Sequence, residues 1–185
     1  MSWSEAVNYC KSVGAKLVEI NSEYENAAIV GEIDRLGYTE RLMYFWIGVT
    51  DQKREGIWKL ASSGERAQYL NWDRRTSEPN NYVGEHYEGE DCAFLRAGGC
   101  REWDHSHWAD VYCWKNVLPI TCPTLGSMTT YYTMNVLCEF ETELVELTTT
   151  PKPDGPDSTN EPIEQIDSGE LVAKSFNLSR DPLFQ

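Results

Sequence analysis

Residues 78–110 read EPNNYVGEHYEGEDCAFLRAGGCREWDHSHWAD, and side chains with carboxylate or amide oxygens dominate this stretch. Hard cations such as calcium take six to eight oxygen ligands from carboxylates, amide carbonyls, the backbone and water. Pro79 fixes its own φ angle and disfavours the helical region for Glu78, so the flanking side chains can be held toward one point. A cis bond between Glu78 and Pro79 would tighten this turn further. The stretch therefore predicts a loop that can enclose a cation.

Further motifs occur in a fixed order around this loop. They are WIG at residues 46–48, EDC at residues 90–92, WAD at residues 108–110 and CEF at residues 138–140. Together with EPN at residues 78–80, they resemble a C-type lectin-like domain over roughly residues 2–140. The resemblance implies an α+β fold with two helices, short antiparallel strands, a long loop region and stabilising disulfides. The strand that precedes the first helix in that family has no counterpart in this sequence, so we expect the chain to begin inside the domain.

The resemblance implies a principal calcium site formed by Glu78, Asn80, Glu90 and Asp110. The first three residues would also bind a sugar, whose two vicinal hydroxyls replace water on the ion. The order of Glu78 and Asn80 is typical of mannose-type sites, which select equatorial 3- and 4-hydroxyls as in mannose, N-acetylglucosamine and fucose-type glycans. Ala109 stands where the family has an asparagine, which supplies a ligand oxygen and an NH₂ group that faces the sugar.

An auxiliary calcium site is also implied by the resemblance. Its ligands would be Asp51, Glu55, Asn81 and Asp91, and Glu90 would be shared with the principal site. Asn81 replaces a residue that is often aspartate in the family, which lowers the ligand charge. The alternative to both sites is a loop of solvated acids that holds no metal.

Six cysteines lie between residues 10 and 138. This even number suits three disulfides in an oxidising compartment, but spacing alone cannot choose among the 15 possible pairings. The resemblance implies bonds between Cys10 and Cys138 and between Cys92 and Cys113. A third bond is then expected between Cys100 and Cys122. The alternative, metal-binding cysteines, lacks any C-x-x-C spacing.

Two helices are predicted near the start of the chain. Ser2 with Glu5 and Ser22 with Glu25 match the capping-box pattern, and apolar residues follow each serine at a spacing of three and four. Gly37 is the expected stop of the second helix.

Strands are predicted where short runs of apolar, β-branched and aromatic residues replace the helical period. These runs are residues 16–20, 45–49, 57–60, 92–95, 108–113 and 136–140. The nine residues between Asn80 and Glu90 predict an enlarged loop, and the 24 residues between Cys113 and Cys138 predict an excursion from the compact fold. Most of the seven tryptophans are expected to fill the core.

Residues 141–185 differ from the rest of the chain because threonine, proline and acidic residues dominate them. Such a segment cannot bury enough apolar surface to offset its ordering entropy. We therefore expect a domain at residues 1–140, followed by a disordered acidic tail or stalk at residues 141–185.

The charge balance narrows the choice of partners. The chain has 16 basic and 30 acidic residues, a formal net charge of −14, which disfavours nucleic acid because phosphate neutralisation needs clustered lysine and arginine. The sequence contains neither a signal peptide nor a run of about 20 apolar residues that would span a membrane. The cysteines and the resemblance imply an extracellular or secreted protein.

Three functional hypotheses follow. The first is a calcium-dependent lectin for mannose-type glycans. The second is a lectin-like domain that binds a protein, with calcium structural or lost, and Ala109 and the two insertions favour it. The third is an enzyme that uses residues 104–107, where His105 and His107 would form a zinc pair. No other residues complete either chemistry, so we expect no enzymatic activity.

Overall fold

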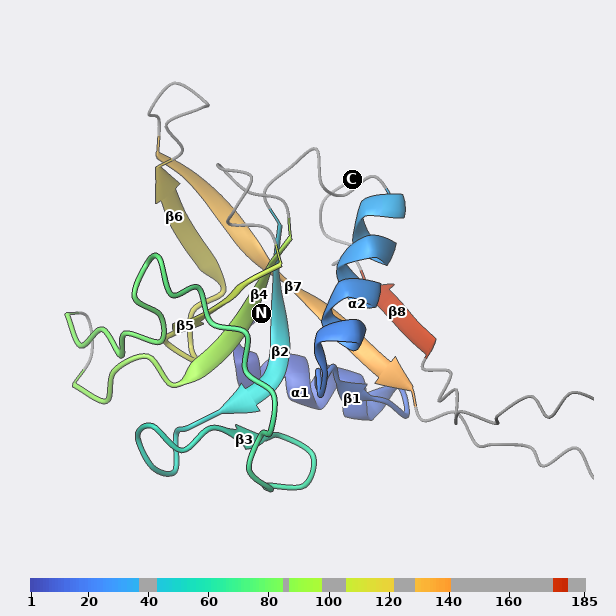
Figure 1. Cartoon of the computed structure of the whole chain (residues 1–185), viewed down its shortest axis with the longest axis horizontal. Helices are drawn as coiled ribbons and strands as arrows, with labels where there is room; N and C mark the ends of the chain where they lie inside the picture. The colour runs from blue at the N-terminus through green and yellow to red at the C-terminus, as the bar shows by residue number, and fades with distance from the viewer. Residues whose placement is uncertain (37–42, 85–86, 98–105, 122–128, 141–174, 180–185) are drawn as a thin grey trace, which may run out of the picture.

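The computed structural model describes residues 1–36, 43–84, 87–97, 106–121, 129–140 and 175–179, and the chain has an α+β fold as predicted (Figure 1). The helices and the first strands are α1 (Trp3–Ser12), β1 (Lys16–Leu17), α2 (Glu23–Arg35), β2 (Met43–Thr50) and β3 (Lys59–Leu60). The later strands are β4 (Cys92–Ala97), β5 (Trp108–Val111), β6 (Val117–Thr121), β7 (Thr129–Phe140) and β8 (Ser175–Ser179).

Both helices begin at the serine that the sequence predicts. The Ser2 hydroxyl accepts a hydrogen bond from the Glu5 backbone N–H, and Glu5 accepts one from the Ser2 N–H, so the first capping box is complete. Ser22 caps α2 in the same way, but the Glu25 carboxylate accepts from the N–H of Asn21 rather than from that of Ser22. The predicted helix stop at Gly37 lies outside the described residues.

The central sheet has the strand order β1-β7-β2-β4-β5. Its neighbours are antiparallel except for β2 and β7, which run parallel. The prediction of antiparallel strands was wrong for this pair. A parallel pair needs a long connection, and the loop region between β2 and β7 supplies it.

Two apolar layers cover opposite faces of the sheet because successive strand residues point to opposite sides. One layer contains Ile29 and Ile33 of α2 together with Phe45 and Ile47 of β2. The other contains Trp3, Ala6 and Cys10 of α1 together with the alternate residues of β2 and β4, among them Trp46 and Phe94. Each helix therefore packs on its own face of the sheet.

Three strands depart from the prediction. The first run forms only the two-residue β1, and β3 begins at Lys59. Within the predicted excursion, β6 pairs antiparallel with the first half of β7, where Pro119 lies opposite Tyr131. The proline and glycine residues of this segment indicated a loop because proline cannot donate to a sheet ladder.

The predicted disordered tail contains one exception. Residues 175–179 form β8, which pairs antiparallel with β7 from Val136 to Phe140. A strand at the edge of a sheet gains main-chain hydrogen bonds, which a compositional argument about apolar burial does not count. Residues 141–174 lie outside the described residues, so for them disorder stays a prediction.

Two of the three expected disulfides are present. Cys10 bonds to Cys138 with an S–S distance of 2.07 Å, and Cys92 bonds to Cys113 with an S–S distance of 1.98 Å. The first bond ties α1 to β7, and the second ties the start of β4 to the segment after β5. The expected bond between Cys100 and Cys122 lies outside the described residues.

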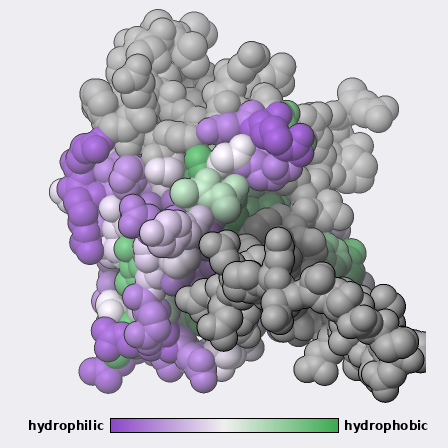
Figure 2. Space-filling view, turned by 45° about the vertical axis from the view of Figure 1, so that its right-hand side comes forward, coloured by the Kyte–Doolittle hydropathy of each residue, from purple (hydrophilic) through white to green (hydrophobic). Residues whose placement is uncertain are grey.

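The tryptophans largely fill the core, as predicted. Of the described ones, only Trp114 is exposed, whereas the others are buried. The hydrophobic patches on the face shown in Figure 2 are small, and hydrophilic residues cover most of the described surface there. Neither described helix has the length and apolar character needed to cross a membrane.

Candidate functional site

The base of the loop region between β3 and β4 is anchored by tryptophans. Trp72 packs against Trp58 with the ring centroids 4.5 Å apart and against Trp108 with the centroids 6.0 Å apart. The backbone N–H of Asp73 donates to the carbonyl of Trp108 over 2.9 Å, so the loop continues along the start of β5. This rigid base holds the predicted ligand residues against the sheet.

The turn at residues 78–81 is bound directly to β5. The Glu78–Pro79 peptide bond is cis. The two carboxylate oxygens of Asp110 accept hydrogen bonds from the backbone N–H groups of Asn80 and Asn81, over 3.0 and 2.8 Å. Two segments that are about 30 residues apart in the sequence therefore meet at this carboxylate.

All four predicted ligands of the principal site line one open pocket of about 310 Å³. Ala109, which replaces the expected asparagine, lies in its wall. The other lining residues are Tyr82, Phe94, Arg96, Val111 and Leu118. The four residues therefore lie together, their role as metal ligands stays a prediction, and two features of the pocket weaken it as a calcium cage.

The first feature is that Ala109 offers no ligand oxygen. The second is that both carboxylate oxygens of Glu78 already have donors, because Oε1 lies 3.3 Å from Nη2 of Arg96 and Oε2 accepts from the side-chain amide of Asn80 over 2.7 Å. Sequence reasoning missed Arg96. The strand alternation of β4 could have indicated it, because residues 94 and 96 share a face.

Two carboxyls of this pocket, those of Glu78 and Glu90, have raised pKa values. Burial raises the pKa of Glu90 to about 8, and the charges of Asp110 and Glu78 add to the shift. Burial also raises the pKa of Glu78 to about 7, with a further contribution from Asp110. Carboxylates that repel one another in a partly desolvated pocket favour protonation or a bound cation.

The predicted auxiliary site is the better formed of the two. Asp51, Glu55 and Asp91 place ligand oxygens within 4.8 Å of one another, and no other such group occurs in the part of the chain that the structure describes. Asp51 is 1% exposed, and its Oδ1 is buried without a hydrogen-bond partner. Burial raises the pKa of Asp51 to about 7. An orphaned buried oxygen beside two more carboxylates fits a hard cation such as calcium.

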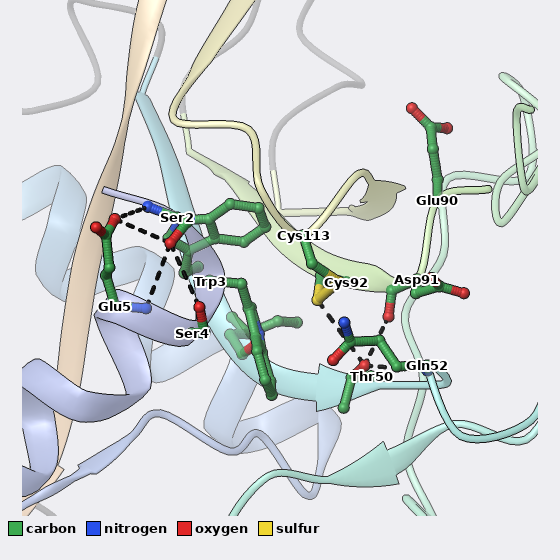
Figure 3. Close-up of a disulfide and its surroundings, with 12 residues drawn as sticks. Ser2, Trp3, Ser4, Glu5, Thr50, Gln52, Glu90, Asp91, Cys92 and Cys113 are labelled. Carbon is green, nitrogen blue, oxygen red and sulfur yellow. Dashed lines mark hydrogen bonds between the residues drawn. A yellow bond between two sulfur atoms is a disulfide. The ribbon is translucent and has the colours of Figure 1, made fainter. Parts of the chain in front are cut away.

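Asn81 joins the two sites. Its side-chain amide donates to Glu55, and its side-chain oxygen accepts from the backbone N–H of Glu90 over 2.9 Å. Glu90 and Asp91 point in different directions (Figure 3). Glu90 therefore lines the principal pocket, and Asp91 belongs to the auxiliary group. Our expectation that Glu90 serves both sites stays a prediction, and the direction of its side chain places that side chain at the principal pocket.

The end of β2 fixes the position of Asp91. The Thr50 hydroxyl donates to the backbone carbonyl of Asp91 over 2.8 Å (Figure 3). The Asp51 N–H donates to the same oxygen over 3.1 Å. The Cys92–Cys113 disulfide follows directly and holds this segment beside β5. The auxiliary carboxylates are therefore positioned by the sheet and the disulfide.

The raised pKa values predict that, in the absence of metal, the stability of the domain falls as the pH rises. In the folded state the pKa values of Asp51, Glu78 and Glu90 lie above their ordinary values of 3.8 to 4.5. Their contribution to the free energy of unfolding is thus fully present below about pH 4 and is lost as the pH rises through 7 to 8. In EDTA we expect the melting temperature to fall from pH 5 to pH 8. Excess calcium should weaken or reverse this trend, and a rising midpoint in EDTA would contradict the assignment.

A match to a family model now gives the class of the protein. Residues 1–124 match the lectin C-type domain, so the chain belongs to the C-type lectin domain family. The members of this family are binding proteins rather than enzymes, they include carbohydrate-binding lectins, and they generally bind calcium.

Individual relatives cover part of the chain. It is 34% identical over 115 residues to asialoglycoprotein receptor 2 of Mus musculus, a match that spans 61% of the chain and 32% of the receptor. It is 27% identical over 121 residues to a perlucin-like protein of Mytilus galloprovincialis, covering 65% of the chain and 69% of that protein. The carbohydrate-recognition domain of the mouse scavenger receptor C-type lectin is 30% identical, with a TM-score of 0.49 over 62% of the chain and 75% of that domain. The chain thus spans about a third of the receptor.

The residues considered for an enzyme have structural contacts. The backbone carbonyl of Ser106 accepts from the side-chain amides of Asn26 and Asn71, over 3.1 and 2.8 Å. His107 lies one residue before β5, where its carbonyl accepts from the N–H of Arg96. Asp104 and His105 lie outside the described residues. The expectation of no enzymatic activity agrees with the family.

Proposed function

We propose that this chain is an extracellular carbohydrate-recognition domain whose loops are ordered by calcium and whose principal pocket binds glycans with equatorial 3- and 4-hydroxyls. Calcium at Asp51, Glu55 and Asp91, with Asn81 beside them, would fix the loop region. A second ion at Glu78, Asn80, Glu90 and Asp110 would contact the sugar. The disulfides support a location in an oxidising compartment.

The observation that carries the proposal is the convergence of the four principal residues on one open pocket. Glu78 and Asn80 come from the turn, Glu90 from the segment before β4 and Asp110 from β5. A bound calcium ion would supply a Lewis acid that accepts two sugar hydroxyls as ligands. The carboxylates of Glu78 and Glu90 would accept hydrogen bonds from the sugar hydroxyls, while the Asn80 amide would donate a hydrogen bond to a hydroxyl oxygen. Asp110 fixes the turn through two backbone N–H groups and so keeps these groups aligned.

The proposal predicts that Ala109→Asn strengthens sugar binding. The new side chain would add a calcium ligand and one donor to a sugar hydroxyl. A hydrogen bond is worth about 0.5 to 1.5 kcal/mol net, which corresponds to about three- to tenfold in affinity. Calorimetric titration with mannose at millimolar calcium measures the change.

A matched control keeps this test specific. Ala27→Asn makes the same substitution on the exposed side of α2 and should leave sugar binding unchanged. A glycan array should report mannose-type ligands ahead of galactose for both the parent and Ala109→Asn. If neither protein binds any glycan at millimolar calcium, the proposed sugar specificity fails.

A second candidate function is the binding of a protein partner, with calcium serving only the auxiliary site. The contact of Arg96 with Glu78 and the absence of a ligand oxygen at Ala109 favour it, because both weaken the principal metal cage. Tyr82 and Tyr87, which are 55% and 83% exposed, would offer aromatic contacts in the enlarged loop. Calcium-dependent stabilisation without retention on mannose resin would select this candidate.

A further inference from the structure

Arg96 places a fixed positive charge inside the principal pocket. Its guanidinium lies 2.9 Å from Asp73 through Nη1 and 3.3 Å from Glu78 through Nη2, and the side chain is 16% exposed. The guanidinium carbon also lies 5.7 Å from the centre of the Phe94 ring. Two carboxylates and one aromatic face therefore hold this cation in place.

The register of the sheet puts Arg96 beside the missing ligand. Phe94 of β4 lies directly opposite Ala109 of β5, and Arg96 is two residues further along β4 on the same face. The side chains of Arg96 and Ala109 thus line the same pocket. An asparagine at residue 109 would project into the same pocket.

Asp73 keeps the guanidinium at the pocket. Asp73 is 1% exposed, its Oδ1 accepts from the Arg75 N–H, and its Oδ2 pairs with Arg96. Asp73 belongs to the anchored base of the loop, and its carboxylate contacts Arg96 through a different guanidinium nitrogen than Glu78 does. Arg96 could release Glu78 and still keep one salt bridge.

The charge of Arg96 acts on the same oxygen that a metal would need. Glu78 has one oxygen on Asn80 and the other on Arg96. A calcium ion that binds Glu78 through Oε1 either displaces Nη2 or shares this oxygen with it, and in both cases the guanidinium lies close to a dication. Like charges at such distances repel strongly in a partly desolvated pocket.

We propose that Arg96 is an intramolecular competitor of calcium at the principal site. Its fixed charge beside Glu78 opposes the binding of the ion and so raises the calcium concentration at which the sugar-binding site forms. This inference deepens the proposed function and rests on its principal site. Arg96 thus makes the principal site bind calcium more weakly than the auxiliary site, which fills first.

Calcium titration by calorimetry at pH 8, without any sugar, tests the proposal on four proteins. For the parent we expect one tight and one weak site. Arg96→Met keeps the apolar stem but removes the charge, and it should tighten the weak site at least about tenfold. Arg96→Lys keeps the charge and should stay within about threefold of the parent. Arg35→Met removes an exposed arginine of α2 and should change neither site.

An unchanged weak site in folded Arg96→Met would overturn the proposal. Since Arg96→Met leaves the buried Asp73 without its partner, the pair Arg96→Met with Asp73→Asn removes the stranded charge and provides a second test. The same tightening is expected in this double variant, and its absence there would equally refute the competition. Loss of glycan binding with a tightened weak site would reject the sugar specificity and leave the role of Arg96 standing.

Discussion

Replacing Cys10 and Cys138 together by alanine is expected to lower the free energy of unfolding by about 4 to 5 kcal/mol, because the bond closes a loop of well over 100 residues. The two cysteines are 128 residues apart and join α1 to β7. For a chain of this size, such a loss corresponds to a fall in melting temperature of about 10 to 20 °C. Equilibrium unfolding in guanidinium chloride measures it.

The second disulfide gives the matched comparison. Cys92 and Cys113 are only 21 residues apart, so replacing both by alanine should cost about 3 kcal/mol. Both double variants lose one disulfide and two sulfur atoms, and three of the four cysteines are fully buried while Cys113 is partly buried, so loop length is the main difference between them. An equal or smaller loss for the pair at Cys10 and Cys138 would show that chain entropy does not control the stabilisation.

Features encoded by neighbouring residues were predictable from the sequence. The capping box of Ser2 and Glu5 forms because its hydrogen bonds join residues three apart, so the sequence pattern contains the whole interaction. The strands β6 and β8 were not predicted, because each of them depends on β7 as a partner. Pairing between distant segments can override a composition that favours loops.

For the candidate site, the sequence predicted which residues lie together but not the contacts that they make. The motifs placed Glu78, Asn80, Glu90 and Asp110, which line one pocket. They did not contain Arg96, since its effect requires both the register of β4 with β5 and the position of Asp73. They assigned Glu90 and Asp91 to different sites but did not give the direction of either side chain, which depends on how the segment meets β2.

Calcium is expected to raise the melting temperature, because the ion binds the folded auxiliary group and not the unfolded chain. At a calcium concentration of about 100 times Kd, a single site adds about 2.7 kcal/mol, or about 5 to 10 °C for a chain of this size. Differential scanning calorimetry in calcium and in EDTA at pH 7.5 gives both midpoints. Identical midpoints would indicate a loop of solvated acids.

The effect of Asp51→Asn on the melting temperature should differ in sign between EDTA and calcium. In EDTA the variant should be at least as stable as the parent, because the amide removes a buried charge that Glu55 and Asp91 repel. In calcium it should be less stable than the parent, because the site has lost a charged ligand. Asp34→Asn, the same change on the exposed part of α2, should shift both midpoints alike and leave the calcium response intact. A loss of stability in Asp51→Asn that is equal with and without calcium would mean that Asp51 supports the loop through its hydrogen bond to Gly56 alone.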